Sequence, residues 1–337
     1  MKKIKAERLR SGDTIGIVSP SSPAASLFPY RLERAKQQLQ KMGFEVKLGR
    51  HAMEQQGYVS GNISDRIEDI HQMFKDPDVK AIIAAIGGNH SCQLINHIDY
   101  ALVAENPKVF VGYSDILVLC MAIWQRTGLV TFYGPTIMTD FAENPKMPVY
   151  SKEYFLKAVN RTQPIGVVQP AAEHINEFVP WGTKHDIENT KKLETSPGWK
   201  CLRGGKARGI LAGGCIEALD HLRSTYFWPT WDETILFLET ASEEPNLAWL
   251  DAVLSDYINM GVFAKIRGLL FGRKNWPDTD IMQMHELILA KTESFLFPII
   301  ADMDFGHVLP MFTLPIGCEA RIDGEALVLE IVEEGVK

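Results

Sequence analysis

The chain has 337 residues, 46% of them hydrophobic and 23% charged, and a formal net charge of −7. This length is enough for two domains with a well-buried core, while the negative charge argues against a nucleic-acid partner, which requires a basic face. The five cysteines are odd in number, scattered and without C-x-x-C spacing, so we expect a cytoplasmic protein with no disulfide framework and no zinc knuckle. The first apolar run, residues 15–18, is too short for a signal peptide, and we expect no membrane partner.

The first half of the chain alternates between strand-like and helix-like segments. Short apolar or β-branched runs predict strands at 14–18, 44–48, 80–86, 109–111 and 131–133. Apolar residues at helical spacing predict helices at 30–42, 64–74, 92–98 and 116–126. This alternation predicts an α/β fold with a doubly wound, mostly parallel sheet in the N-terminal domain.

The pattern changes between about residues 143 and 203, where six prolines interrupt a polar stretch that contains one predicted helix, 152–159. We interpret this stretch as a connector with a long functional or mobile loop. Strand patterns then resume at 209–211, 235–238, 266–271, 297–301, 320–322 and 326–331, with helices at 216–222 and 247–260. The sequence therefore predicts an N-terminal domain over 1–145, a connector over 146–205, and a smaller, β-rich α/β domain over 206–337.

One turn in the N-terminal half has the layout of a nucleophile site. The strand 109–111 ends at Gly112, and Ser114 stands in the turn before an apolar, helix-like segment. Open α/β sheets bind ligands at the carboxyl ends of their strands, and a helix N-terminus favours an oxyanion. The layout is like the nucleophile elbow of the α/β-hydrolases, although Ile116 replaces the second glycine of G-x-S-x-G. The alternative is that Ser114 only caps the helix, as most Ser-Asp pairs before an apolar run do.

A serine nucleophile needs a base within hydrogen-bond reach and an acceptor that orients the base. His307, in a Gly-His turn after a predicted strand, is the candidate base. Glu239, at the end of the run 235–238, is the candidate acceptor, with Glu243 and Glu244 as rivals. A capping or core histidine and a solvated carboxylate are the simpler interpretations.

Two glycines offer backbone amides to a substrate. Gly87 and Gly88 close the 80–86 run and precede Asn89, and glycine permits close approach of the backbone. Together with the amide of Asp115 they would form an oxyanion hole. An ordinary glycine turn is the alternative.

Other chemistries have less support. Neither G-x-G-x-x-G nor G-x-x-x-x-G-K-[ST] occurs, so we expect no nucleotide cofactor. Asp302, Asp304 and His307 are potential metal ligands for a metal hydrolase, but no H-E-x-x-H accompanies them, so we expect no catalytic metal. Cys92 is an alternative nucleophile, although its place in a predicted helix favours a small buried side chain.

In this order the motifs resemble the LD-carboxypeptidase family of serine peptidases, and within it the microcin C self-immunity branch. The resemblance spans nearly the whole chain and rests on the order of the motifs, since each alone is weak. The segments are 12–23 (GDTIGIVSPSSP), 86–89 (IGGN), 112–115 (GYSD), 128–135 (GLVTFYGP), 211–214 (LAGG), 235–239 (ILFLE), 306–307 (GH) and 314–317 (LPIG).

The resemblance implies a Ser-Glu-His triad, which falls on Ser114, Glu239 and His307, and an oxyanion hole from the backbone of Gly88 and Asp115. It also implies no metal or cofactor, and commonly a homodimer. In the implied reaction the serine attacks an amide-type carbonyl while the histidine takes its proton. Water then hydrolyses the acyl-enzyme.

Two substrate classes divide this family. LD-carboxypeptidases remove the terminal D-alanine of a murein tetrapeptide in cell-wall recycling, whereas the immunity branch cleaves the bond between an aspartyl group and a modified adenylate. The segment 175–181 (INEFVPW) resembles the immunity loop whose aromatic pair sandwiches adenine. Phe178 and Trp181 are then substrate-binding residues, as is Asn89 of the 86–89 motif. The alternative is that the two rings only pin a long loop onto the core.

Some positions depart from the family's pattern. Cys215 stands where asparagine is usual, Ser224-Thr225 where Gly-Thr is frequent, and 240–245 is atypical, which bears on the natural substrate more than on the triad. We therefore expect a serine hydrolase of the immunity type acting on a small aminoacyl- or peptidyl-nucleotide. An LD-carboxypeptidase acting on a muropeptide is the alternative. The competing class is a binding protein whose two lobes close on a ligand without chemistry.

Overall fold

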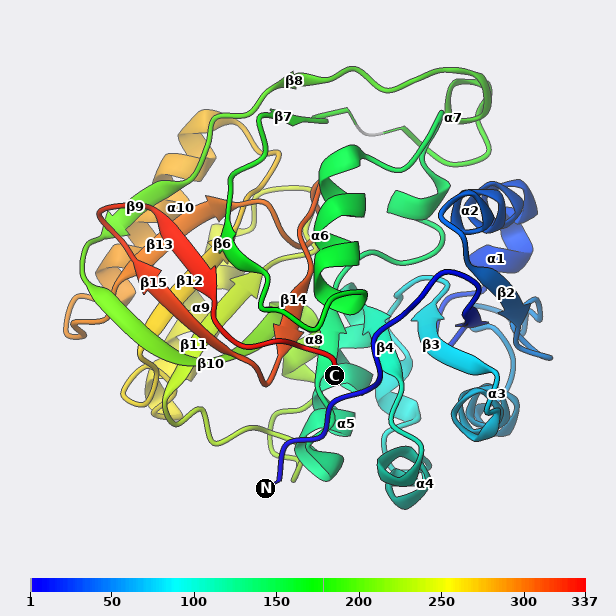
Figure 1. Cartoon of the computed structure of the whole chain (residues 1–337). Coiled ribbons are helices and arrows are strands. Elements are labelled where there is room, and N and C mark those ends of the chain that lie inside the picture. Colours follow the sequence, from blue (N-terminus) through cyan, green and yellow to red (C-terminus); the bar gives the residue numbers. More distant parts are fainter. Residues whose placement is uncertain (1, 178) are drawn as a thin grey trace.

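The computed structural model describes residues 2–177 and 179–337 and confirms the predicted α/β architecture (Figure 1). The first sheet has six strands in the order β14-β5-β4-β3-β1-β2. Its first five strands in sequence are parallel, as predicted. They are β1 (Thr14–Val18), β2 (Glu45–Leu48), β3 (Val79–Ala84), β4 (Val109–Gly112) and β5 (Thr131–Tyr133). The sixth, β14 (Leu314–Ile316), was not predicted; it returns from the C-terminal half and pairs antiparallel with β5.

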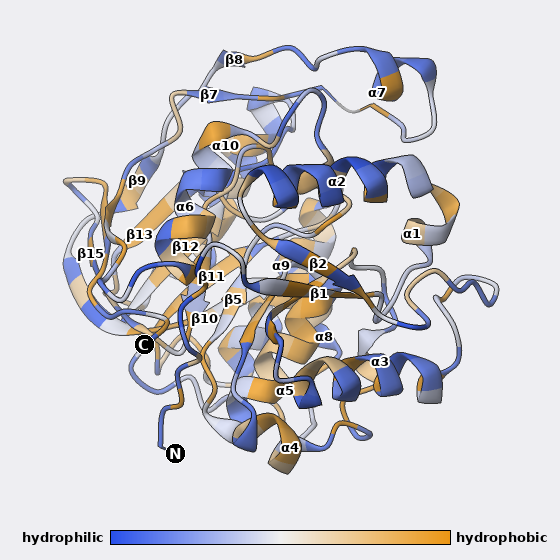
Figure 2. Cartoon of the chain, turned by 45° about the vertical axis from the view of Figure 1, so that its right-hand side comes forward, coloured by the Kyte–Doolittle hydropathy of each residue, from blue (hydrophilic) through white to orange (hydrophobic). Residues whose placement is uncertain are grey.

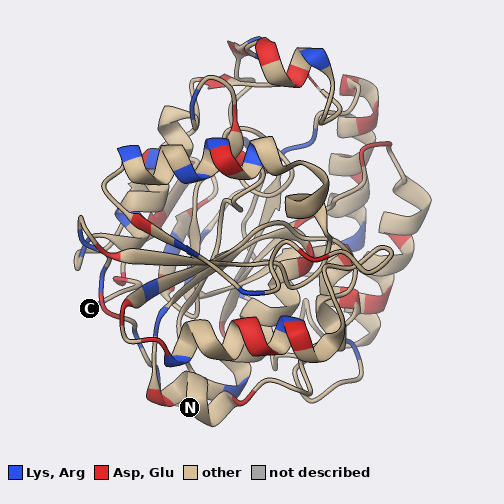
Figure 3. Ribbon diagram, turned by 90° about the vertical axis from the view of Figure 1, so that its right-hand side faces the viewer, with Lys and Arg blue, Asp and Glu red and all other residues tan. Residues whose placement is uncertain are grey.

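Helices lie on both faces of this sheet, with α2 on one side and α3, α4 and α5 on the other (Figure 2). They are α1 (Ala24–Leu27), α2 (Pro29–Lys41), α3 (Ile63–Lys75), α4 (Tyr100–Glu105) and α5 (Leu117–Thr127). The ribbons of α2 and α3 carry several charged residues, coloured blue and red (Figure 3), and each helix buries only one stripe of residues, as its periodicity predicts. The side chain of Asn62 caps α3, and Gly128, with a φ of 76°, ends α5.

The predicted helix at 92–98 is wrong, because only a 3-10 turn, η1 (Ser91–Gln93), forms there. Polar groups at its start make tertiary contacts instead. The amide and hydroxyl of Ser91 donate to Asp115 at 2.9 and 2.7 Å, and Arg66 donates to Gln93 at 2.6 Å. The unpredicted helix α4 begins later, where the Asp99 side chain accepts the amide of Leu102 at 2.9 Å.

The second sheet has eight strands in the order β6-β16-β15-β10-β11-β12-β13-β9. Its central four are parallel and its outer pairs antiparallel. The strands are β6 (Gly166–Val168), β9 (Lys200–Arg203), β10 (Lys206–Cys215), β11 (Thr234–Glu239), β12 (Gly268–Gly272), β13 (Ile299–Met303), β15 (Glu319–Asp323) and β16 (Val328–Ile331). The stretch 146–205 therefore supplies two edge strands of this sheet.

The remaining elements are α6 (Val149–Val159), α7 (Lys184–Glu188), α8 (Ile216–Asp220), α9 (Leu247–Asn259), α10 (Asp278–Lys291), the ribbon β7 (Glu173–His174) with β8 (Glu194–Thr195), and the 3-10 turns η2 (Ser114–Ile116) and η3 (Asp140–Ala142). Helix α10 was missed because only Met284 and Ile288 of its fourteen residues are buried, which leaves a weak apolar stripe. Among the described residues, no helix has both the length and the apolar character needed to cross a membrane.

Candidate active site

Ser114 lies in the sharp turn between β4 and the helical segment η2–α5, with a φ of 60°. A positive φ is uncommon for a residue other than glycine and marks a strained turn. The capping alternative is wrong, because within the described residues the Ser114 hydroxyl contacts His307 and no side chain caps the start of η2 or α5. Gly87 packs directly against the serine: a Cβ atom there would lie 3.0 Å from the Ser114 Cβ and 3.1 Å from its Oγ. The turn therefore holds the hydroxyl half-exposed against the β3 loop.

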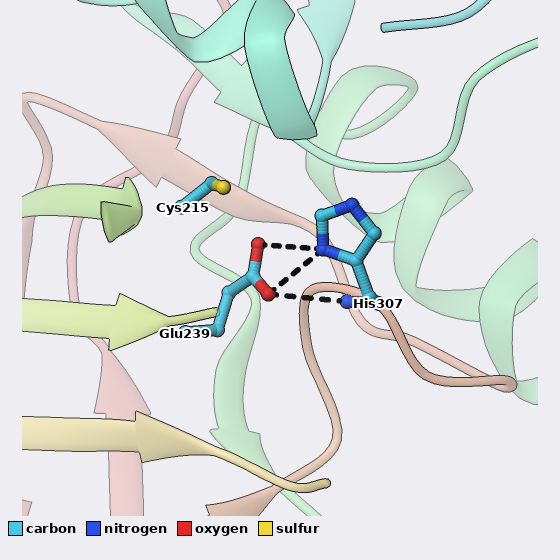
Figure 4. A group of neighbouring side chains, drawn as sticks. All are labelled: Cys215, Glu239 and His307. Carbon is cyan, nitrogen blue, oxygen red and sulfur yellow. Dashed lines mark hydrogen bonds and ion pairs between the residues drawn. The ribbon is translucent and has the colours of Figure 1, made fainter. Parts of the chain in front are cut away.

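The predicted base and the predicted acceptor lie beside this serine. Nε2 of His307 is 3.0 Å from the Ser114 Oγ. Its Nδ1 is 2.9 and 3.1 Å from the two carboxylate oxygens of Glu239 (Figure 4). The preceding residue, Gly306, has a φ of 88°, and a Cβ there would collide with the glutamate side chain. The structure thus brings the three predicted residues into one hydrogen-bonded line. Gly306, which has no side chain, allows His307 to approach Glu239 closely.

Glu239 ends β11 and is 1% exposed. The hydroxyl of Tyr133 donates to this carboxylate and also accepts the amide of Ser114 at 3.3 Å. Burial alone would raise the pKa of Glu239, but the charge of His307 and hydrogen bonds from His307 and Tyr133 outweigh it and lower that pKa below its usual value. The carboxylate is therefore ionised at neutral pH, in the form that accepts the Nδ1 proton of an imidazole.

Two backbone amides at the predicted oxyanion hole are free. Within the described part of the chain, neither Gly88 nor Asp115 donates its amide to another protein group. The Asp115 carboxylate also fixes the opposite loop, because it accepts the amides of His90 and Ser91 at 3.1 and 2.9 Å. Free N–H groups beside a serine hydroxyl are suited to an oxyanion. Asn89, predicted to bind substrate, lies exposed in the same loop.

The rival residues lie in other environments. Asp302 pairs with His285 at 2.9 Å, and Asp304 accepts the indole N–H of Trp199 at 2.8 Å. They are therefore engaged away from His307, so the alternative metal site is not assembled among the described residues. Glu243 lines the neighbouring cavity, while Glu239 holds the position against the imidazole.

A cavity of about 320 Å³ opens beside His307. Trp181 lines it, together with Tyr113, Lys274 and Trp276. Phe178 lies outside the described residues, so only half of the predicted aromatic pair is placed.

Trp181 also packs against the body of the protein. Its ring stacks on the Arg31 guanidinium at 4.5 Å and meets Phe28 edge-on at 5.6 Å. The same arginine pairs with Asp186 of α7 and, at 3.0 Å, with Glu143. The ring thus both pins the loop and faces the cavity, so the two alternatives for Trp181 are compatible.

Sequence reasoning missed Tyr133 and Lys274. Tyr133 stands at the carboxyl end of β5, next to β4, the strand that leads into the Ser114 turn, and this position was the available signal. Lys274 is 6% exposed and donates to the carbonyl of Thr240 at 2.7 Å, directly after Glu239. No local motif marks it.

The two α/β lobes thus place a serine, a histidine and a glutamate in one hydrogen-bonded line. Residues 15–134 match the LD-carboxypeptidase N-terminal domain and residues 208–322 match the LD-carboxypeptidase C-terminal domain. The chain belongs to this peptidase family, as the sequence motifs indicated.

Individual relatives cover almost the full chain. The Bacillus subtilis protein YocD, which carries a carboxypeptidase name, is 34% identical over 94% of this chain and 95% of its own. The Escherichia coli microcin C7 self-immunity protein MccF is 29% identical over 98% and 96%. A solved structure of MccF in complex with aspartyl sulfamoyl adenosine matches with a TM-score of 0.91 at 28% identity, covering 99% of this chain and 100% of that one.

Proposed function

We propose that this protein is a serine peptidase of the microcin immunity type, which hydrolyses the bond between an aminoacyl group and a modified adenylate. The observation that carries the proposal is the line from Ser114 through His307 to buried Glu239, at 3.0 and 2.9 Å. The similarity to MccF, one of whose structures contains aspartyl sulfamoyl adenosine, supports the choice of substrate class.

In the proposed reaction the Ser114 oxygen attacks the acyl carbon while its proton moves to Nε2 of His307. The carbonyl oxygen becomes an oxyanion that accepts the amides of Gly88 and Asp115. Collapse of this intermediate breaks the bond to the leaving nitrogen, which receives the proton from Nε2. Water then repeats the sequence on the acyl-enzyme and frees Ser114. Throughout, Glu239 holds the imidazole with Nδ1 protonated.

Paired assays on purified full-length protein test this function. Wild type, Ser114→Ala and the control Ser255→Ala are each given an aspartyl sulfamoyl adenylate and a murein tetrapeptide ending in D-alanine. The Ser255 hydroxyl donates to Asp251 of α9 and accepts from Lys291 of α10, outside the site. We expect Ser114→Ala to lose at least about 10³-fold in turnover, since only binding and the oxyanion amides remain, and to keep ligand affinity.

The substrate arm discriminates between the two peptidase classes. Cleavage of the adenylate alone supports the immunity type, whereas cleavage of the tetrapeptide alone makes the protein an LD-carboxypeptidase. Turnover that survives in Ser114→Ala would contradict the serine mechanism, and binding without turnover in wild type would identify a binding protein. The homodimer and the cytoplasmic location stay predictions, and light scattering measures the first.

The role of Trp181 has its own test. Stacking of a base on an aromatic ring is worth about 1–3 kcal/mol, so Trp181→Ala should raise KM for the adenylate by about 5–150-fold. Phe28→Ala is the matched control, because it removes the edge contact that pins the same ring without removing a cavity wall. Equal KM increases in both variants would show that the ring acts only by packing.

A further inference from the structure

A cysteine thiol lies beside the charged end of the Ser-His-Glu line. Cys215 is the last residue of β10, and its register partner across the parallel ladder is Glu239, the last residue of β11. The backbone therefore places both side chains at the same sheet end. The Cys215 Sγ, a Glu239 carboxylate oxygen and a His307 ring nitrogen all lie within 4.8 Å of one another (Figure 4).

These three atoms are the donor types that zinc prefers. Structural and catalytic zinc sites use cysteine sulfur at about 2.3 Å, histidine nitrogen at about 2.0–2.1 Å and carboxylate oxygen at about 2.0–2.2 Å. The 2.9 Å between Nδ1 and the carboxylate oxygen is a hydrogen-bond distance, so the carboxylate must rotate aside and the sulfur must move inward before one ion contacts all three atoms. Cys215 is 2% exposed and Glu239 1%, which shields these two donors from competing water, while His307 borders the cavity through which an ion can enter.

Two carboxylates and one ammonium surround the thiol. A second carboxylate, that of Glu217, lies 3.2 Å from the Cys215 sulfur and offers a fourth ligand. It is held in place by the hydroxyl of Thr240 and the amide of Ala241. Two carboxylates therefore converge on one thiol, and the Lys274 ammonium, which donates to the Thr240 carbonyl, offsets part of their negative charge.

We propose that Cys215, Glu239 and His307 form a binding site for a thiophilic divalent cation such as Zn²⁺, and that the bound ion switches the hydrolase off. The ion is an inhibitor in this proposal and has no role as a cofactor. Binding of the metal is independent of the proposed function, whereas the inhibition rests on it.

The proton balance explains the inhibition. The ion takes the lone pair of Nδ1, so the neutral imidazole must carry its proton on Nε2, the nitrogen 3.0 Å from the Ser114 hydroxyl. A protonated Nε2 has no lone pair to accept the serine proton. The thiol loses its proton to solvent when its sulfur binds, so each ion releases one proton.

Cobalt absorption tests the site without reference to activity. Full-length wild type, Ser114→Ala, Cys215→Ser and Cys215→Ala are titrated with Co²⁺, with Cys201→Ser as the control at an exposed cysteine. We expect a thiolate-to-cobalt charge-transfer band in wild type, Ser114→Ala and Cys201→Ser, and none in the two Cys215 variants. Loss of a metal's supporting groups alone costs about 10–100-fold in affinity, so loss of the sulfur should cost at least that.

A wild-type protein without the band, or a band that persists in both Cys215 variants, would overturn the site. Zinc inhibition is then measured with the substrate that wild type cleaves. We expect inhibition that a chelator reverses in wild type and Cys201→Ser, and at least about tenfold weaker inhibition in Cys215→Ser. A cobalt band with no zinc inhibition would overturn the switch, whereas a band in a protein that cleaves neither substrate would count against the proposed function alone.

Discussion

Replacing Tyr133 with phenylalanine removes one oxygen that serves two parts of the site. The hydroxyl donates to Glu239 and accepts the amide of Ser114. A hydrogen bond to a charged group contributes about 1.5–3 kcal/mol, and a buried donor left without a partner costs about 1–3 kcal/mol. We therefore expect Tyr133→Phe to lower the free energy of unfolding by about 2.5–6 kcal/mol in urea denaturation at neutral pH.

The same variant should lose activity through orientation. Tyr133 helps to hold the carboxylate against His307, and 1.36 kcal/mol of lost transition-state stabilisation corresponds to about tenfold in rate. We expect kcat to fall by about 10–100-fold with KM nearly unchanged. Because the tyrosine hydrogen bond helps to lower the pKa of Glu239, the acidic limb of the pH–kcat/KM profile should also move to higher pH.

Tyr100→Phe is the matched control for this variant. Its hydroxyl donates to the Ile95 carbonyl at 2.6 Å, outside the site, so its loss should affect stability and leave kcat and the pH profile as in wild type. A Tyr133→Phe protein with wild-type kcat and an unshifted acidic limb would refute the positioning role. Equal kcat losses in the two variants would refute it as well.

Two further predictions concern close packing and buried charge. Gly87→Ala places a methyl group about 3 Å from the Ser114 Oγ. Because a displacement of a reacting group by about 1 Å costs about 10²-fold in rate, we expect kcat to fall by at least that factor while the circular dichroism spectrum stays that of wild type. A variant with wild-type kcat would refute this. Burial raises the pKa of Asp140 to about 6 from 3.8, so the folded state binds the extra proton and wild-type stability falls as pH rises through this window. Asp140→Asn removes that fall and should gain about 3 kcal/mol relative to wild type between pH 3.8 and pH 7.5; urea denaturation that gives the same difference at both pH values would contradict the assignment.

Local patterns were enough to predict most of the first sheet and the turn that carries Ser114. The β-branched runs, Gly112 and the apolar segment after it all act over a few residues, which is the range at which sequence patterns report structure. His307 and Glu239 were also found from their positions after strands. The carboxyl ends of the strands were therefore a good guide to the site.

Non-local contacts could not be predicted in this way. Tyr133 matters because its hydroxyl reaches both Ser114 and a glutamate 106 residues further along the chain. The prediction of a helix at 92–98 was wrong for the same reason, because hydrogen bonds from Ser91 to the distant Asp115 compete with helix formation. The pattern of residues along one sequence does not show which distant residues will become hydrogen-bond partners in the fold.

The segment that contains β14 connects the two sheets and thereby limits how the site can move. Leu314 pairs with Tyr133 of the first sheet. A few residues later, the amide of Gly317 donates to the Leu211 carbonyl of β10, and the amide of Leu211 donates to the carbonyl of Cys318, both at 2.8 Å. Closure of one sheet on the other would break these bonds, which argues against a binding protein that works by moving its lobes. Trp181 lines the cavity beside His307, so under the proposed function the ring that contacts the ligand lies on a different part of the chain from Ser114, Glu239 and His307.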